Sequence, residues 1–324
     1  MTSPSWRKFL LWAILSERNF CVLVLQNKGK FTEGKAIGSN LSNPVIIVGA
    51  ARSGTTMMRD ALSRHPDLGL VPYEMNGLWH YGISNIKHDM LDAQVHFTPE
   101  NAQYIRSELA RILASTGKKR LIEKTAANVM RIDFVHAVLP DAKIVHIVRD
   151  GRAVVASALI RWQAKPEAGY LMKKAGTIPL SRLPKMALEY GLNRIKGAVS
   201  GRGHTMSWGP VWPELASDMD VLPLVGVCAK QWQVSVKSAF ASRIPAEQIM
   251  QIRYEDVVAD PENVFNSIAS FLDIDPTAPD FQQHICTQIN DGSADKWREA
   301  FSSEELKIIY SVAGEVLQEL GYVS

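Results

Sequence analysis

The chain has 324 residues, of which 46% are hydrophobic and 21% charged, and its formal net charge is +3. This composition is typical of a folded globular protein and excludes a fibrous or fully disordered chain, while the small net charge does not indicate a nucleic-acid binder. Its three cysteines, Cys21, Cys228 and Cys286, are far apart and fit no disulfide framework or metal-ligand spacing. They favour a reducing, cytoplasmic compartment.

Residues 1–43 are expected to form an N-terminal arm that precedes the main domain. Segment 9–25 is apolar, but Glu17 and Arg18 lie near its centre. Each central charge costs on the order of 3 kcal/mol in a membrane span, so a transmembrane helix is not expected. No small-residue cleavage site of a signal peptide follows the apolar run. Because the arm has six Lys/Arg against two Asp/Glu, it leaves open a peripheral contact with a membrane or a partner.

Residues 44–59 read PVIIVGAARSGTTMMR and predict a strand, a glycine loop and a helix start. Such a loop binds phosphate through its backbone N–H groups and the helix N-terminus. The spacing of Gly49 and Gly54 matches a P-loop, but Thr55 stands where nucleoside triphosphatases have a lysine, and Arg52 is the one cation of the loop. The loop therefore indicates a site for a phosphate-like group without ordinary ATP chemistry.

Strands and helices alternate along the rest of the chain. Strands are expected near 45–49, 68–71, 120–124, 143–148 and 248–253, and helices near 55–64, 99–115, 128–138, 151–162, 224–241, 262–272 and 303–320. This alternation predicts an α/β fold with a mostly parallel sheet flanked by helices. The last helix has a capping-box pattern at Ser302 and Glu305, and Gly321 follows it.

Polar residues follow three of the expected strands. Residues 143–158 read KIVHIVRDGRAVVASA, so Arg149 ends a strand and Ser157 lies eight residues further on. An arginine offers a planar fork to a phosphate, and a hydroxyl adds a neutral donor. The alternative is an ordinary strand–turn–helix unit in which Arg149 pairs with Asp150. Lys124 ends the strand before, and Glu74 follows the motif HPDLGLVPY.

The glycine loop GAARSGTT and the Arg149–Ser157 segment together resemble the sulfotransferases that use 3′-phosphoadenosine-5′-phosphosulfate (PAPS). The resemblance runs from about residue 44 to 322. In motif pattern it is nearest to the tyrosylprotein and carbohydrate-type branch, whose base is a glutamate. It implies a P-loop-like sulfotransferase domain at 44–324, PAPS as co-substrate and no metal. The acceptor would be a hydroxyl of a carbohydrate, natural product, lipid or tyrosine.

The resemblance also implies roles for individual residues. Glu74 would be the base, Lys124 would stabilise the bridging oxygen as the sulfate leaves, and Arg52 would neutralise charge. The residues expected to contact PAPS are Arg52, Ser53, Gly54, Thr55, Thr56, Arg149, Ser157, Tyr254, Lys296 and Trp297. Ser53, Gly54 and Thr55 would act through backbone N–H groups.

Several of these assignments have alternatives. Glu74 lies one residue further from the loop than the family pattern expects, so His80 and His88 compete as the base, although both lie in a polar segment typical of surface histidines. Lys124 could be a solvated lysine at the end of its strand, and Tyr254 could be a structural residue at a sheet edge. Lys296 and Trp297 could belong to a plain surface loop.

The segment from about 162 to 216 is expected to contribute to acceptor specificity. It contains eight Lys/Arg against three Glu, together with Trp162, Trp208 and Trp212. Cations and indole faces suit an anionic or sugar-like acceptor. The alternative is a solvated helical insertion whose tryptophans are buried by packing.

Two other function classes stay open from the sequence. A small-molecule kinase on a modified P-loop would need the missing lysine and a Mg²⁺ ligand. A non-catalytic nucleotide- or polysaccharide-binding module would need neither Glu74 nor Lys124. The presence of both residues favours an enzyme.

Overall fold

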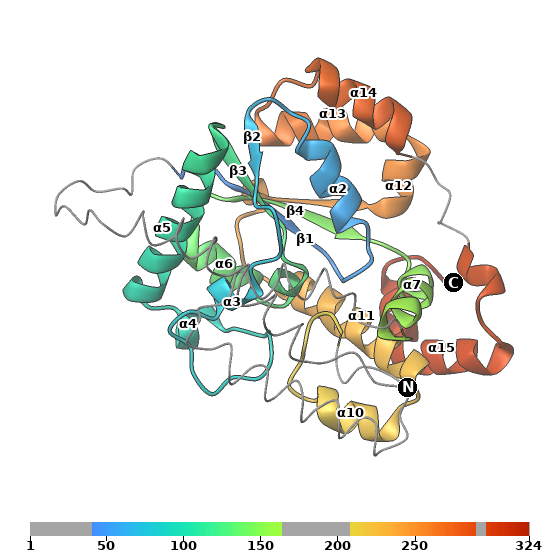
Figure 1. Ribbon diagram of the computed structural model, residues 1–324. Helices are drawn as coiled ribbons and strands as arrows, with labels where there is room; N and C mark the ends of the chain where they lie inside the picture. The colour runs from blue at the N-terminus through green and yellow to red at the C-terminus, as the bar shows by residue number, and fades with distance from the viewer. Residues whose placement is uncertain (1–40, 164–207, 290–295, 324) are drawn as a thin grey trace, which may run out of the picture. The chain divides into compact units, whose positions relative to one another are not determined.

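The computed structural model describes residues 41–163, 208–289 and 296–323. Residues 1–40 of the expected N-terminal arm (1–43), residues 164–207 of the basic segment, residues 290–295 and residue 324 lie outside these ranges. At the centre is a five-stranded, all-parallel sheet in the order β2-β3-β1-β4-β5 (Figure 1). The strands are β1 (Val45–Val48), β2 (Leu68–Leu70), β3 (Arg120–Glu123), β4 (Lys143–Val148) and β5 (Ile249–Arg253). The predicted α/β class and all five predicted strands are confirmed.

Helices cover both faces of this sheet. One face is covered by α2 (Thr55–Leu62), α12 (Tyr254–Ala259), α13 (Pro261–Leu272) and α14 (Pro279–Gln288). The other is covered mainly by α5 (Pro99–Thr116), α6 (Ile132–Val138), α7 (Gly151–Gln163), α11 (Leu224–Phe240) and α15 (Ser303–Glu319). Short elements complete the described chain: α3 (Asn76–Trp79), α4 (Ala93–His96), α10 (Leu215–Val221) and the 3-10 helices η1 (Ala126–Met130), η2 (Ala246–Gln248) and η3 (Lys296–Glu299).

The two faces of the sheet form two separate hydrophobic cores. In β1, Val45 and Ile47 pack into the core with α2 and α13, while Ile46 and Val48 pack into the core with α5, α7 and α11. This alternation follows from the two-residue period of a strand, and burial on both faces explains why β1 is apolar throughout. The helices on the two sides hold the sheet rigid, and its strand ends can therefore fix loop residues in place.

The helices differ from the expectation in several places, and α3, α4, α10 and α14 were not expected. The helix expected at 128–138 is divided into η1 and α6, because Arg131 has an extended φ of −147° at the junction. Its side chain is fully buried and makes long-range hydrogen bonds, which override the helical pattern. Helix α12 begins directly after β5, where only a link to the next helix was expected.

The end of the chain follows its sequence closely. In α15 the Ser302 hydroxyl accepts a hydrogen bond from the Glu305 N–H, and the Glu305 side chain accepts one from the Ser302 N–H. The predicted capping box is therefore confirmed, and Gly321 after the helix has a positive φ of 70°.

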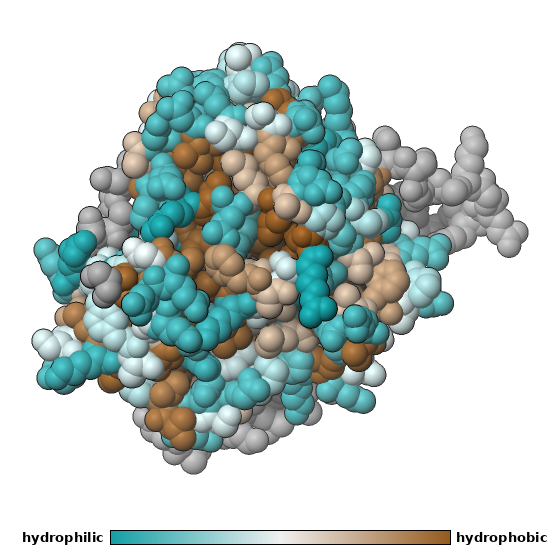
Figure 2. Space-filling view, turned by 180° about the vertical axis from the view of Figure 1, so that it is seen from behind, coloured by the Kyte–Doolittle hydropathy of each residue, from teal (hydrophilic) through white to brown (hydrophobic). Residues whose placement is uncertain are grey.

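The exposed surface is mixed in character. Figure 2 shows the side opposite to that of Figure 1, where hydrophobic residues gather in the middle of the face and hydrophilic residues surround them. In the part of the chain that the structure describes, no helix combines the length and the hydropathy that crossing a bilayer requires.

Candidate active site

The glycine loop connects β1 to α2 and has an unusual backbone. Arg52 and Gly54 both have a positive φ, of 76° and 99°, and the Ser53 N–H closes a turn by donating to the Ala50 carbonyl at 3.0 Å. A Cβ at Gly54 would lie 2.6 Å from the Tyr254 ring, and only glycine avoids both this overlap and the strain of a positive φ. The loop therefore lies in close contact with the start of α12.

The loop ends at the N-terminus of α2. Gly54 is the N-cap residue, and the first helical bond of this turn runs from the Met58 N–H to the Gly54 carbonyl at 3.0 Å. The N–H groups of Thr55 and Thr56 belong to the first turn, where no intrahelical acceptor is available. Among the described residues the buried Ser53 hydroxyl also has no hydrogen-bond partner. Donors at a helix N-terminus together with an unsatisfied buried hydroxyl fit a phosphate-like ligand.

Arg52, Arg149 and Ser157 are brought together although they lie far apart in sequence. Arg52 Nε donates to Ser157 Oγ at 2.9 Å, and Arg149 Nη1 donates to the Arg52 carbonyl at 3.3 Å. Arg149 ends β4, and Ser157 lies two turns along α7, so the strand and the helix that follow each other in the chain supply both groups. The structure thus joins the predicted 3′-phosphate residues to the predicted phosphosulfate loop.

Positive charge accumulates at this cluster. The pKa of Arg52 is lowered first by burial and then by the charges of Arg161 and Arg149. Arg161 lies on the exposed side of α7 and was not singled out in the sequence, where its position one helical turn beyond Ser157 was the available signal. The three guanidinium groups repel one another electrostatically, and a bound anion would relieve this repulsion. The cluster therefore favours anion binding.

Tyr254 lies between the glycine loop and Arg149. The Arg149 guanidinium is 4.0 Å from the centroid of the Tyr254 ring, and the ring occupies the space above Gly54. The neighbouring Glu255 accepts a hydrogen bond from the Asp150 N–H at 2.9 Å, which fixes the turn after β4. Tyr254 therefore packs against two elements of the anion cluster, as a stacked residue at the start of a helix.

Lys296 and Trp297 form the start of η3. Lys296 is exposed, whereas Trp297 is buried and its ring centroid lies 3.9 Å from the guanidinium of Arg152. Arg152 is held by Asp150, next to Arg149 in sequence. Trp297 is thus close to the turn between β4 and α7, and its contact with an adenosine stays a prediction.

Glu74 and Lys124 form an ion pair. Lys124 Nζ donates to Glu74 Oε1 at 2.5 Å, and the two side chains are 7% and 39% exposed, respectively. Lys124 directly follows β3, and Glu74 lies in the loop after β2, so each comes from the carboxyl end of a strand of the sheet. Ligands of open α/β sheets bind at these carboxyl ends. The structure therefore places the predicted base and the predicted lysine in direct contact.

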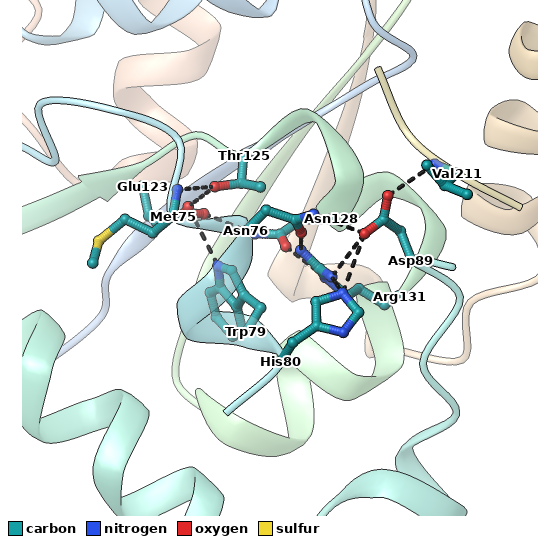
Figure 3. Close-up of polar contacts among 10 residues, drawn as sticks. All are labelled: Met75, Asn76, Trp79, His80, Asp89, Glu123, Thr125, Asn128, Arg131 and Val211. Atoms are coloured by element: carbon teal, nitrogen blue, oxygen red, sulfur yellow. Dashed lines mark hydrogen bonds and ion pairs between the residues drawn. The ribbon is translucent and has the colours of Figure 1, made fainter. Parts of the chain in front are cut away.

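A buried polar network lies beside this ion pair (Figure 3). It connects the segment after Glu74 to the segment after Lys124. Its members are Met75, Asn76, Trp79, His80, Asp89, Glu123, Thr125, Asn128, Arg131 and Val211.

The charged members of the network respond to burial. Burial raises the pKa of Glu123, against the effect of hydrogen bonds from Thr125 and Trp79. Burial lowers the pKa of Arg131 to about 10, against the attraction of Asp89 and Glu123. Burial acts to raise the pKa of Asp89, but its hydrogen bonds and the Arg131 charge outweigh burial and lower it. Sequence analysis missed this network, because its polar residues have no local spacing that marks them as partners.

The interpretation of His80 as a surface residue is wrong. Its Nε2 lies 3.0 Å from Arg131 Nη1 and 3.2 Å from Asp89 Oδ1, inside the polar network. The side chain is 20% exposed, and its Nε2 is occupied by these partners. His80 is therefore a member of the buried polar network that links Asp89 and Arg131.

Two of the three tryptophans considered for acceptor stacking are buried and do not face a ligand site. Trp162 and Trp212 are buried in the hydrophobic core around α7 and α11, and Trp212 Nε1 also donates to Asp218 at 2.7 Å. The packing alternative is correct for both, because no face of a fully buried indole is accessible to a ligand. Trp208 is partly buried against the same core. Most of the basic segment, 164–207, lies outside the described residues.

Two curated proteins align with part of this chain. The nodulation protein NoeE of Sinorhizobium fredii is 29% identical over 129 residues, which cover 36% of this chain and 31% of NoeE. A Caenorhabditis briggsae protein, named as a candidate protein-tyrosine sulfotransferase, is 28% identical over 147 residues, which cover 41% of this chain and 48% of that protein. The chain thus spans less than half the length of each of these relatives.

Among solved structures, sulfotransferase STF9 from Mycobacterium avium is similar over 87% of this chain and 77% of its own length, with a TM-score of 0.49 and 14% sequence identity. The family model described as the sulfotransferase family matches residues 44–178 and 214–279, which contain the glycine loop, the Glu74–Lys124 pair and the Arg149–Ser157 segment. This match extends over more than half of the sequence. The chain belongs to the sulfotransferase family.

Proposed function

We propose that this protein transfers the sulfuryl group of PAPS to a hydroxyl of an acceptor. The observation that carries the proposal is the convergence of Arg52, Arg149 and Ser157 beside the N-terminus of α2. This cluster and the Glu74–Lys124 pair both lie at the carboxyl ends of strands of the sheet. The first group suits a nucleotide with phosphates at both its 5′ and 3′ positions. The second group suits proton removal and the stabilisation of a leaving oxygen.

The residues around the loop would hold the co-substrate. The N–H groups of Gly54, Thr55 and Thr56 and the Ser53 hydroxyl would bind the 5′-phosphosulfate at the helix N-terminus. Arg149 and Ser157 would bind the 3′-phosphate, which requires Ser157 to share its hydroxyl between the phosphate and Arg52. Tyr254, Lys296 and Trp297 would complete the nucleotide site. PAPS supplies the sulfuryl group, and no metal has a role in this scheme.

Glu74 would remove the proton of the acceptor hydroxyl. As the acceptor oxygen bonds to sulfur, the bond from sulfur to the bridging oxygen breaks, and the products are a sulfate ester and 3′,5′-diphosphoadenosine (PAP). Lys124 and Arg52 would balance the negative charge that grows on the leaving phosphate. Lys124 is bonded to Glu74 in the free protein, so it holds the base beside the leaving-group position before the acceptor arrives.

Two features of the chain bear on the acceptor class. The tyrosylprotein and carbohydrate-type branch is supported by the position of Glu74 after β2 and by its contact with Lys124. The net positive charge of the 162–216 segment supports an anionic or sugar-like acceptor. Trp162 and Trp212 no longer contribute to this argument, since both are buried.

A thermal-shift comparison tests the nucleotide. At equal concentrations PAP should raise the unfolding temperature more than ATP with Mg²⁺, because a ligand stabilises the fold by RT ln(1 + [L]/Kd). A larger shift with ATP and Mg²⁺ would favour the kinase alternative. A shift with PAP but no sulfate transfer to any of a panel of sugars, phenols and lipid alcohols would favour the non-catalytic binding module.

Replacement of Glu74 tests the base. Glu74→Gln keeps the shape and the hydrogen bond to Lys124 but cannot accept a proton. Turnover should fall by ~10²–10⁴, while PAP affinity stays nearly unchanged. Retention of more than about a third of the wild-type turnover would remove Glu74 from this role. His88→Ala would then be the next variant, since His88 Nδ1 is buried without a hydrogen-bond partner in the described structure.

A further inference from the structure

The loop that carries Glu74 is exposed, yet its backbone is tied down at defined points. Pro72, Tyr73 and Glu74 are all exposed residues. On either side of them, the Val71 N–H donates to the Ile122 carbonyl at 2.9 Å and the Met75 N–H donates to Thr125 Oγ1 at 3.0 Å. Both acceptors belong to the segment 120–131, which also contains Lys124.

The Thr125 hydroxyl is a donor in one hydrogen bond and an acceptor in another. Thr125 is fully buried, and its hydroxyl donates to Glu123 Oε1 at 2.5 Å. A hydroxyl has a single proton, so once it donates to Glu123 its lone pairs are free to accept the Met75 N–H. Met75 follows Glu74 and Thr125 follows Lys124 in the chain. The two segments are therefore joined at consecutive positions, by an ion pair and by a backbone hydrogen bond.

The rest of the network holds Glu123 and the next residue of the loop. Asn128 Nδ2 donates to the second oxygen of Glu123 at 2.8 Å, and Asn128 Oδ1 accepts from Arg131 Nε at 2.9 Å. Arg131 Nη2 donates to Asn76 Oδ1 at 2.5 Å. Figure 3 shows these side chains pointing toward one another from β3, η1 and α3.

A buried polar network of this kind contributes little to the free energy of folding, because its charged groups lose their hydration when they are buried. Buried ionic groups give little net stabilisation compared with an apolar core of the same volume, whereas a fully satisfied network fixes one geometry. The contacts converge on the backbone beside Glu74, where a displacement of about 1 Å can reduce turnover by about 10²-fold.

We propose that Thr125 is a positioning residue, whose hydroxyl bridges the Glu123 carboxylate to the Met75 N–H and so holds Glu74 in register with Lys124. This inference rests on the proposed function, in which Glu74 is the base. Thr125 itself contacts neither reactant. Its loss should therefore change the rate of the chemical step and leave the nucleotide site intact.

The test compares Thr125→Val, which removes the hydroxyl at nearly constant volume, with Thr125→Ser, which keeps it. Thr116→Val is the matched control, because the Thr116 hydroxyl, like that of Thr125, both donates and accepts: it donates to the Leu113 carbonyl at 2.7 Å and accepts from the Lys118 N–H at 3.2 Å. Amide hydrogen exchange of the peptide spanning 71–80, PAP affinity by calorimetry, and kcat and KM are measured. The acceptor is the one selected on the wild type from the panel above.

In Thr125→Val we expect faster exchange of peptide 71–80 and a kcat reduced roughly 10- to 100-fold, with PAP affinity within about twofold of the wild type. Thr125→Ser should recover kcat to within about threefold, and Thr116→Val should change neither quantity. The proposal is overturned if Thr125→Val keeps wild-type kcat and exchange, if PAP affinity falls in parallel with kcat, or if serine fails to rescue.

Two further variants keep the result interpretable. If Thr125→Val does not fold, Asn76→Ala removes the neighbouring tie to Arg131 and should show the same pattern of faster exchange and lower kcat. Wild-type values for both in Asn76→Ala overturn the proposal. Glu74→Gln is measured beside them: if it retains turnover, the proposed base is wrong, whereas if it loses turnover and Thr125→Val does not, only the positioning role is wrong.

Discussion

The two halves of the candidate site are built by different means. The half proposed to bind the nucleotide, here called the nucleotide half, consists of the loop at 49–56 and the turn between β4 and α7, and it presents backbone N–H groups, glycines and arginines. The half with the proposed base, here called the base half, consists of the segments 71–80 and 120–131, and its side chains meet in the network of Figure 3. A site made of backbone groups needs a short motif, whereas a site made of side-chain partners needs the whole fold.

The buried residues that support the two halves also differ in character. Under the nucleotide half, β1 and β4 are apolar, and the one buried histidine of β4, His146, is kept neutral. Under the base half, the buried groups Glu123, Asp89 and Arg131 are charged or hydrogen-bonded. Changes in the nucleotide half should therefore alter binding, and changes in the base half should alter turnover.

After Glu74→Gln, the largest effect is expected from Lys124→Met, which keeps the length of the buried stem and removes the charge beside Glu74. Loss of a donor that stabilises developing charge should reduce kcat by ~10²–10³. The control is Lys119→Met, because Lys119 forms an exposed pair with Asp67 at 2.9 Å before the amino ends of β3 and β2, at the opposite end of these strands from Lys124. Equal kcat values for the two variants in a sulfate-transfer assay would contradict a catalytic role for Lys124.

The sequence was sufficient to predict the strands and to single out residues of the proposed nucleotide half that the structure brings together. Runs such as Val45–Val48 are apolar throughout, as strands buried on both faces must be, and Gly54 and Arg149 lie within short motifs that follow such runs. Their neighbours in space are neighbours in sequence or lie at the end of the adjacent strand. Local spacing therefore contained most of the information.

The network of the base half could not be predicted in this way. Asn76, Asp89 and Arg131 look like ordinary polar residues of loops and helices, and their partnership depends on how β2, β3 and η1 come together. The same long-range contacts broke the helix expected at 128–138 at Arg131. Trp162 and Trp212 were wrongly considered for acceptor stacking for a related reason. The sequence around a tryptophan in a basic segment does not show whether its indole is buried or exposed.

The second prediction concerns the sheet under the nucleotide half. Burial lowers the pKa of His146 from its ordinary 6.5 to about 4, so between these values the unfolded chain binds a proton that the folded chain does not. Stability should therefore fall as the pH falls from 6.5 to 4, by roughly 3 kcal/mol from this group.

Urea unfolding at pH 7.5 and 4.5 measures this contribution. His146→Gln should lose less stability between the two pH values than the wild type, whatever its absolute stability. His96→Gln is the control, because His96 is partly exposed on α4 and outside the sheet. The same pH dependence in His146→Gln and the wild type would show that His146 is not the group responsible.

The third prediction separates the two phosphates of the nucleotide. Arg149→Ala should weaken PAP binding by ~10- to 150-fold, since a charge-assisted hydrogen bond contributes ~1.5–3 kcal/mol. Binding of adenosine-5′-phosphosulfate, which lacks the 3′-phosphate, should change much less.

Arg253→Ala is the matched control for Arg149→Ala. Arg253 also lies over a tyrosine, 4.4 Å from the Tyr322 ring centroid, but it is the last residue of β5 and its Nη1 donates to the Leu320 carbonyl after α15 at 3.1 Å. It removes one stacked guanidinium without touching the loop. Calorimetry that found equal weakening of both nucleotides in Arg149→Ala would remove this residue from the 3′-phosphate role.

The smallest effect is expected from Arg161, which acts on the nucleotide half through its charge. It contributes to the lowered pKa of Arg52 and lies on the exposed side of α7, where solvent and salt screen its field. Arg161→Gln should therefore weaken PAP binding by about fivefold or less at low salt, and the difference should disappear near 0.5 M NaCl. Arg111→Gln removes an exposed arginine of α5, outside both halves, which pairs with Glu108 at 2.8 Å, and should leave PAP affinity unchanged at either salt concentration. A loss that persists at high salt would mean that Arg161 contacts the nucleotide directly, and an equal loss in Arg111→Gln would mean that the effect is not specific to the anion cluster.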